Sequence, residues 1–124
     1  KTVKNDDDEA LRNTTFADGA KVTEGDSLID THKLYAVAPR DVAMRMNAHF
    51  VDANKITHDL EQSLGVEGSK KLHMWYKPGE HPALPQGRQD NTHYNIYGAH
   101  VVAGLLSDAL VKEIPVLGKY HIEK

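Results

Sequence analysis

Residues 89–112 have the sequence QDNTHYNIYGAHVVAGLLSDALVK, and this stretch is the most informative about the fold. Its apolar residues recur at helical spacing and form one stripe: Ile96, Ala99, Val102, Leu105, Leu106, Ala109 and Leu110. The periodicity predicts a helix from about Asn95 to about Lys112, directly after the polar sequence 90–93. The chain therefore places a carboxylate and an imidazole at the entry to its longest predicted helix.

A shorter helix and a strand are predicted further upstream. Apolar spacing predicts a helix at about 38–47, with Pro39 in its first turn, where a proline is tolerated. The short apolar run 49–52 ends in Asp52 and predicts a buried parallel strand whose carboxyl end faces a cleft. Asp52 either lines that cleft or caps the next helix.

The segment between this strand and the long helix is predicted to hold two helices and a loop. Asn54 is expected to cap a helix that ends at Gly65, and a shorter helix follows at 67–72. Residues 77–92 contain three prolines and two glycines and predict a loop. The order helix, strand, helix, loop, helix is typical of the second half of an α/β domain.

Length and composition limit the classes of protein that fit. The 124 residues suffice for one domain, in which 1–31 is polar and predicted to be mostly loop and 32–124 carries the folded part. A net charge of −3 disfavours nucleic acid as a partner, and no apolar stretch is long enough to span a membrane. The chain has no cysteine, so thiolate chemistry is excluded.

The sequence Asp90-Asn91-Thr92-His93 has the D-x-x-H spacing of a hydrolase acid–base pair. In a tight turn the carboxylate of Asp90 reaches Nδ1 of His93 and leaves Nε2 as a base. The same spacing also suits an aspartate that merely caps the helix, so the surrounding sequence has to decide between the two.

The surrounding sequence resembles the rhamnogalacturonan acetylesterase branch of the SGNH (GDSL) hydrolases, over roughly residues 28–118. The matching positions are Met74-Trp75, Pro78-Gly79-Glu80, Gly87, Gln89 to Tyr94, Gly98-Ala99 and Val102-Ala103-Gly104, with Asp30-Thr31-His32, Tyr35, Arg40, Val42-Ala43 and Phe50-Val51-Asp52 upstream. The resemblance implies a three-layer α/β/α, flavodoxin-like domain with a parallel sheet. It also implies that 32–124 is the C-terminal half of this domain, so that the N-terminal strands are missing.

The resemblance further implies a Ser-His-Asp triad in which His93 and Asp90 are catalytic. The reaction would remove acetyl groups from a pectin-type polysaccharide such as rhamnogalacturonan through an acyl-enzyme, without a cofactor. The same resemblance implies a secreted or periplasmic protein. Other SGNH members cleave lipid or other small acyl esters, and a non-catalytic, carbohydrate-binding remnant is a further alternative.

The nucleophile is not identified in this sequence. Gly25-Asp26-Ser27-Leu28 has the letters of the family's serine block, but residues 20–24 before it are polar, whereas the block needs a buried strand there. Ser27 is therefore an unlikely nucleophile, and no G-x-N-D string supplies oxyanion donors. We expect association with the missing N-terminal half or with a second copy of the chain.

Three further residues are candidates for a substrate cleft. Trp75 could stack on a sugar ring or belong to the core, and Asp52 and Asn91 could line the same cleft. The eight histidines form no recognised ligand spacing, so no metal site is predicted.

Overall fold

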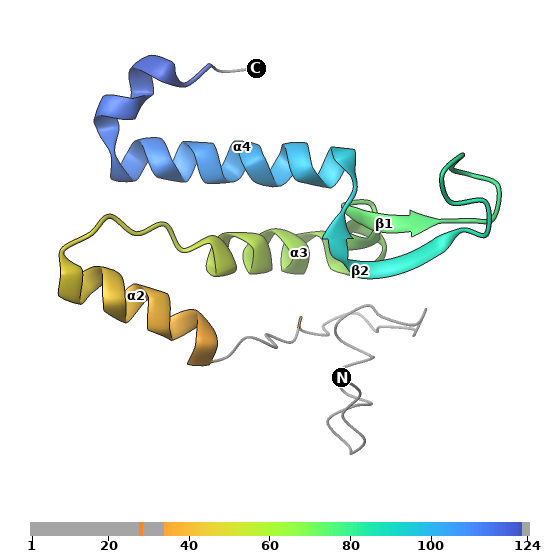
Figure 1. Cartoon of the computed structure of the whole chain (residues 1–124), viewed down its shortest axis with the longest axis horizontal. Coiled ribbons are helices and arrows are strands. Elements are labelled where there is room, and N and C mark those ends of the chain that lie inside the picture. Colours follow the sequence, from red (N-terminus) through yellow and green to blue (C-terminus); the bar gives the residue numbers. More distant parts are fainter. Residues whose placement is uncertain (1–27, 29–33, 123–124) are drawn as a thin grey trace.

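The computed structural model describes residue 28 and residues 34–122 (Figure 1). The predicted loop at 1–31 (apart from residue 28), the serine at position 27 and the matching block 30–32 lie outside these residues. In chain order the elements are α2 (Leu34–Met46), α3 (Ala53–Lys70), β1 (His73–Tyr76), β2 (Arg88–Tyr94), α4 (Ile96–Glu113) and the 3-10 helix η1 (Pro115–Tyr120).

The two long helices, α3 and α4, lie side by side, and the hairpin of β1 and β2 lies at one end of the pair (Figure 1). The chain leaves the C-terminal end of α3 into β1 and enters the N-terminal end of α4 from β2. Helix α2 lies toward the other end of α3, and η1 turns back from the far end of α4 (Figure 1). The hairpin is therefore the junction at which α3 and α4 are held together.

The sheet of the described residues is a two-stranded antiparallel hairpin. The predicted strand at 49–52 is wrong, because 48–52 connects α2 to α3 without regular structure. A strand needs partners for its backbone N–H and C=O groups, and in the described part of the chain β1 and β2 pair only with each other. The predicted loop 77–92 is wrong from residue 88 onward, where β2 begins.

Helix α2 begins four residues before the predicted start at 38, so Pro39 lies inside it rather than in its first turn. Proline has no N–H to donate to the carbonyl four residues earlier, which belongs to Tyr35. Both residues are exposed, so water can reach the carbonyl that has lost its donor. This exposure accounts for a proline in the interior of a helix.

Helix α3 contains an interruption at Gly65, which has φ 66° and ψ −169°. The predicted helix end at this glycine and the shorter helix after it are therefore confirmed, since only glycine adopts this backbone conformation freely. The cap is Asp52 rather than Asn54, because the Asp52 carboxylate accepts from the backbone N–H of Lys55 over 3.0 Å.

Helix α4 confirms its predicted extent, and Asn95 caps it. The side-chain oxygen of Asn95 accepts from the backbone N–H of Gly98 over 2.8 Å. The backbone N–H of Asn95 donates to the carbonyl of Leu72 over 2.9 Å, and a Cβ at Gly98 would lie 2.0 Å from that carbonyl oxygen. The first turn of α4 therefore packs directly on the backbone that leads into β1.

The buried hydrophobic residues of the described chain are few: Ala43, Leu72 and Val102. Leu72, at 1% exposure, lies where the chain leaves α3 for the hairpin. The predicted stripe on α4 is largely uncovered, because only Val102 is buried while Ile96 is 80% exposed and Leu105 and Leu110 are exposed as well. None of the helices in the described part of the chain is long and apolar enough to cross a membrane.

Candidate active site

The sequence 91–93 forms a bulge in β2. Met74 pairs with Asp90, and the preceding residue His73 pairs with Tyr94. The partners on β1 are consecutive, whereas three residues separate their partners on β2. Extra residues on one strand are excluded from the ladder and turn outward, and such bulges are common beside active sites. The D-x-x-H sequence is therefore a turn built into the end of a strand.

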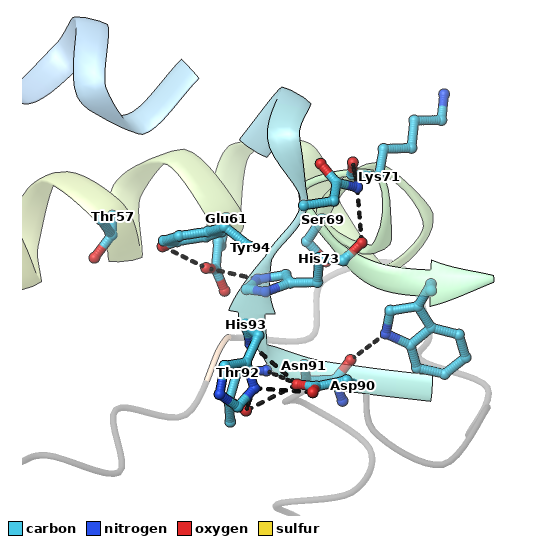
Figure 2. Close-up of polar contacts among 12 residues, drawn as sticks. Thr57, Glu61, Ser69, Lys71, His73, Asp90, Asn91, Thr92, His93 and Tyr94 are labelled. Atoms are coloured by element: carbon cyan, nitrogen blue, oxygen red, sulfur yellow. Dashed lines mark hydrogen bonds and ion pairs between the residues drawn. The ribbon is translucent and has the colours of Figure 1, made fainter. Parts of the chain in front are cut away.

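The carboxylate of Asp90 accepts hydrogen bonds at both oxygens (Figure 2). Oδ1 accepts from the backbone N–H groups of Thr92 (2.8 Å) and His93 (3.0 Å) and from the Thr92 hydroxyl (2.8 Å). Oδ2 accepts from Nδ1 of His93 (2.9 Å) and from Nε (3.1 Å) and Nη2 (2.7 Å) of Arg88. All six donor atoms come from residues 88–93, so the turn supplies its own partners.

These bonds hold the pKa of Asp90 far below that of an ordinary carboxyl. The backbone N–H of Thr92 is the largest cause, and the backbone N–H of His93 and the side chains of both residues add to it against the opposing effect of burial. Asp90 is therefore an anion throughout the range in which a histidine titrates.

The neighbours of the His93 ring determine which ring nitrogen carries the proton. The single hydroxyl proton of Thr92 is used in the bond to Oδ1 of Asp90, so the Thr92 oxygen, 3.1 Å from Nδ1 of His93, can only accept there. Oδ2 of Asp90 is also an acceptor. Nδ1 therefore carries a proton, and in the neutral ring Nε2 is the unprotonated nitrogen.

The His93 ring is open to solvent. Its side chain is 68% exposed, whereas that of Asp90 is 12% exposed. Among the residues that the structure describes, Nε2 of His93 has no hydrogen-bond partner. The arrangement can therefore take a proton from a hydroxyl group that approaches Nε2 and hold the resulting imidazolium against Asp90.

A second polar cluster lies on the other side of β2 (Figure 2). Nε2 of His73 lies 3.1 Å from Oε1 of Glu61, and the hydroxyl of Tyr94 donates to the same oxygen over 3.4 Å. The rings of His73 and Tyr94 stack with centroids 4.8 Å apart. Burial and then the nearby charge of Glu61 raise the pKa of Tyr94. This cluster fixes the strand residue that directly follows His93.

Sequence reasoning missed this cluster, because Glu61 and Tyr94 are 33 residues apart and belong to different elements. It also missed the clamp formed by the amide of Asn95, which donates to the carbonyls of Lys71 and His73 over 2.8 Å each. An asparagine before a helical pattern signals a cap, but the sequence does not say which carbonyls its amide reaches.

Asn91 belongs to the bulge, and its side chain is hydrogen-bonded to that of Trp75 on β1. The indole N–H of Trp75 donates to Oδ1 of Asn91 over 2.6 Å, so Asn91 ties the bulge to β1. The Trp75 ring is half-buried, and Nζ of Lys70 lies 4.8 Å from its centroid. Trp75 is thus neither a core residue nor a freely exposed ring.

Trp75 lines an open groove of about 670 Å³ along the hairpin. The other lining residues are Glu67, Lys70, Tyr76, Lys77, Pro78, Glu80, Gln86, Gly87, Arg88 and Gln89. Gly87 has φ +76°, and a Cβ there would lie 2.6 Å from the Tyr76 carbonyl oxygen, so glycine is required where the loop returns against β1. Arg88 connects this groove to Asp90.

Asp52 does not join the other candidates. It caps the N-terminal end of α3 and forms an ion pair with Arg40. That end of α3 lies remote from the hairpin (Figure 1). The helix-cap alternative is therefore the one that the structure supports, and Asp52 lines a separate hollow of about 310 Å³. The pKa of Asp52 is lowered, chiefly by the backbone N–H of Lys55.

The described residues hold no group of three or more histidine, aspartate or glutamate side chains arranged to bind a metal ion. Around the hairpin the titratable groups that lie together are the Asp90–His93 pair and, separately, the buried His73 with the half-buried Glu61 and Tyr94.

Comparison with known proteins adds one relative. Over 88 residues, 71% of this chain, the sequence is 34% identical to a protein of Bacillus subtilis (strain 168) named rhamnogalacturonan acetylesterase RhgT. The matched region is 38% of that protein, so the chain spans well under half of its relative's length. No family model matches the chain. No solved structure matches it either.

Proposed function

Because this chain belongs to the rhamnogalacturonan acetylesterase-like branch of the SGNH hydrolases and spans part of such a protein, we propose that it supplies the acid–base pair of a carbohydrate esterase. The observation that carries the proposal is the 2.9 Å contact between Oδ2 of Asp90 and Nδ1 of His93, with Nε2 of the same ring at the surface. In this proposal His93 is the proton carrier and Asp90 its orienting partner.

The reaction proposed is acyl transfer in two steps. Nε2 of His93 takes the proton of a serine hydroxyl as the serine oxygen attacks the carbonyl carbon of an acetyl ester. His93 then gives that proton to the leaving sugar oxygen, and the acetyl group stays on the serine. Water next attacks the acyl-enzyme with its proton passing to Nε2, and acetate leaves as the serine recovers its proton.

Asp90 contributes to both steps by remaining charged. Its low pKa keeps it an anion, so each time His93 becomes an imidazolium it faces a negative oxygen at 2.9 Å. The backbone donors to Oδ1 prevent the carboxylate from rotating away. The serine and the oxyanion donors would come from outside residues 34–122, and we propose that another part of an SGNH domain supplies them. Association with a second copy of the chain would cover apolar surface without supplying that serine.

The exposed apolar side of α4 supports such an association, since a large uncovered apolar surface favours a partner. The three-layer domain with a parallel sheet belongs to the same proposal, with the described hairpin and helices at its edge. Because polysaccharides are met outside the cytoplasm, we further propose that the protein acts in the periplasm or outside the cell.

We propose that the acetylated polysaccharide lies along the groove beside the hairpin. Trp75 and Tyr76 offer ring faces and Gln86 and Gln89 offer planar amides, which are the groups that bind sugar rings and hydroxyls. Lys70 covers one face of the Trp75 ring, so stacking there would require its ammonium group to move aside.

A chimera tests this function. The stretch of the Bacillus subtilis relative that aligns with this chain is replaced by the matching 88 residues, and release of acetate from acetylated rhamnogalacturonan is measured. We expect an active chimera that loses activity by about a thousandfold or more with His93→Ala, the order seen for triad residues. His100→Ala, an exposed histidine on α4, is the matched control and should leave turnover unchanged.

A folded chimera without esterase activity would contradict the proposal and favour a binding remnant. Activity on small acyl esters alone would indicate a lipid or aryl esterase instead of a polysaccharide deacetylase.

The prediction about Ser27 is tested on the 124-residue chain itself, with p-nitrophenyl acetate as substrate. We expect Ser27→Ala to have no effect on any hydrolysis observed, while His93→Ala lowers it. Loss of hydrolysis in both variants would show that Ser27 is the nucleophile after all.

A further inference from the structure

Arg88 shares the Asp90 carboxylate with His93. Arg88 and Asp90 are two residues apart on β2, so their side chains leave the same face of the strand. Nε and Nη2 of Arg88 donate to Oδ2 of Asp90 over 3.1 and 2.7 Å. This oxygen is also the one that accepts from Nδ1 of His93 over 2.9 Å. A guanidinium and an imidazole are therefore bound to one oxygen atom.

Arg88 first restricts the orientation of the Asp90 carboxylate. A guanidinium is a rigid planar group, so two of its N–H groups directed at one oxygen restrict the position of that oxygen. The other carboxylate oxygen of Asp90, Oδ1, is held by the backbone N–H groups of Thr92 and His93 in the bulge. Arg88 thus completes the set of contacts that keeps Oδ2 directed at His93.

The positive charge of Arg88 also affects how strongly Asp90 attracts a proton to His93. A carboxylate beside an imidazole favours the protonated ring, and a cation bound to that carboxylate offsets part of its negative potential. Arg88 keeps its charge at every pH relevant to histidine. It therefore limits how strongly Asp90 stabilises the His93 imidazolium.

We propose that Arg88 is a positioning residue of the Asp90–His93 pair, which holds Oδ2 against His93 and keeps the ring able to release its proton to the leaving group. The inference rests on the proposed function, in which His93 takes a proton and returns it within one turnover. A general base that binds its proton too strongly is slow to act as the acid of the following step.

Among residue 28 and residues 34–122, no other charged group takes the place of Arg88 beside Asp90. In the part of the chain that the structure describes, Asp90 is the group that forms an ion pair with His93, and Arg88 is the cation bound to Asp90. On the opposite side of β2 the carboxylate of Glu61 is engaged by His73 and Tyr94. Removal of the Arg88 charge should therefore act on His93 directly, as the loss of a nearby cation, and through Asp90.

The test is an NMR titration of the ring resonances of His93 in the 124-residue chain, assigned with His93→Ala. In Arg88→Gln we expect the titration midpoint of His93 to rise by roughly 0.5–2 pH units, the range that removal of a nearby unit charge gives between a water-like and a surface dielectric. Arg88→Lys keeps the charge and loses the planar fork. Its midpoint should stay near that of the wild type, while the Nδ1 proton exchanges faster with water.

Arg45→Gln is the matched control, because Arg45 is an exposed arginine on α2 and should leave the His93 midpoint unchanged. An unchanged or lower midpoint in a folded Arg88→Gln chain would overturn the inference. If Arg88→Gln does not fold, wild-type behaviour of both the midpoint and the Nδ1 proton in Arg88→Lys would overturn it. The titration needs no ester, so its failure is distinct from an inactive chimera.

Discussion

At the hairpin end of the molecule polar groups are densely bonded over a short stretch of chain, whereas along α4 apolar side chains face solvent. All six donor atoms to Asp90 come from residues 88–93. On α4 only Val102 of the predicted apolar stripe is buried, and Ile96 is among the most exposed residues of the helix. The polar groups of the hairpin are satisfied locally, whereas the apolar stripe of α4 is largely uncovered among the described residues.

This difference shows that the candidate site is specified by a short stretch of sequence and needs few contacts with distant parts of the chain. A turn whose donors and acceptors lie within six residues needs little from distant segments, because each partner is held by the adjacent backbone. A helix obtains most of its stability from packing of its apolar face. The chemistry is therefore encoded locally, while the stability of the helices is not.

The largest effect is expected from the buried residue at the junction of the two regions. Leu72→Ala removes the most buried side chain and should lower the free energy of unfolding by about 2–5 kcal/mol. Leu105→Ala on exposed α4 should change it by less than about 0.5 kcal/mol. Urea unfolding of both variants compares the regions directly, and equal losses would show that the α4 face is covered in solution.

Alanine at Gly98 and alanine at Gly104, both on α4, should change the free energy of unfolding in opposite directions. Gly98→Ala places a methyl group 2.0 Å from the Leu72 carbonyl oxygen, so it should cost about 3 kcal/mol. Gly104→Ala meets no atom within 4 Å and should stabilise the helix by up to about 1 kcal/mol. Thermal unfolding measures both variants. A tolerated Gly98→Ala would mean that α4 does not pack against the hairpin as described.

Acid should destabilise the hairpin region through Asp90. In the unfolded chain this carboxyl takes up a proton near pH 3.9, whereas the folded pKa lies far lower. Its contribution is complete above the unfolded pKa and is lost as the pH falls below about 4 toward the folded pKa. Between pH 6 and pH 3 the wild type should therefore lose more stability than Asp90→Asn. Parallel losses in the two chains would contradict the assigned hydrogen bonds.

The smallest effect is expected at an exposed ion pair far from the hairpin. Nζ of Lys55 lies 2.5 Å from Oδ2 of Asp59, one turn along α3, and both side chains are well exposed. Lys55→Ala should change the free energy of unfolding by less than about 0.5 kcal/mol, because water and salt screen such pairs. If urea unfolding showed a loss of more than about 1 kcal/mol in the free energy of unfolding, Lys55 would make stabilising contacts outside α3 as well.

The features that could be predicted from the sequence are those with local causes. Asn95 at the start of α4, the break at Gly65 and the contact between Asp90 and His93 each depend on neighbours within four residues. The relationship to the acetylesterase was also visible from the sequence, and the 34% identity over 88 residues confirms it.

The features that could not be predicted depend on pairing across the chain. The hairpin was hidden by the prolines between its strands, and its bulge follows from the pairing of His73 with Tyr94, which no local pattern specifies. Arg88 was overlooked because its role depends on that strand geometry. The strand at 49–52 was predicted from its apolar residues, but a strand forms only where a partner strand is present.

The bulge holds His93 with its proton on Nδ1 and leaves Nε2 as a base. Long-range proton–nitrogen NMR of the 124-residue chain, at a pH where the ring is neutral, identifies the tautomer. The contacts with Asp90 and Thr92 predict a protonated Nδ1 and an unprotonated Nε2 in the wild type, and a loss of this preference in Asp90→Ala. A wild-type ring protonated on Nε2 would contradict the account, because that nitrogen could not accept the proton of a serine.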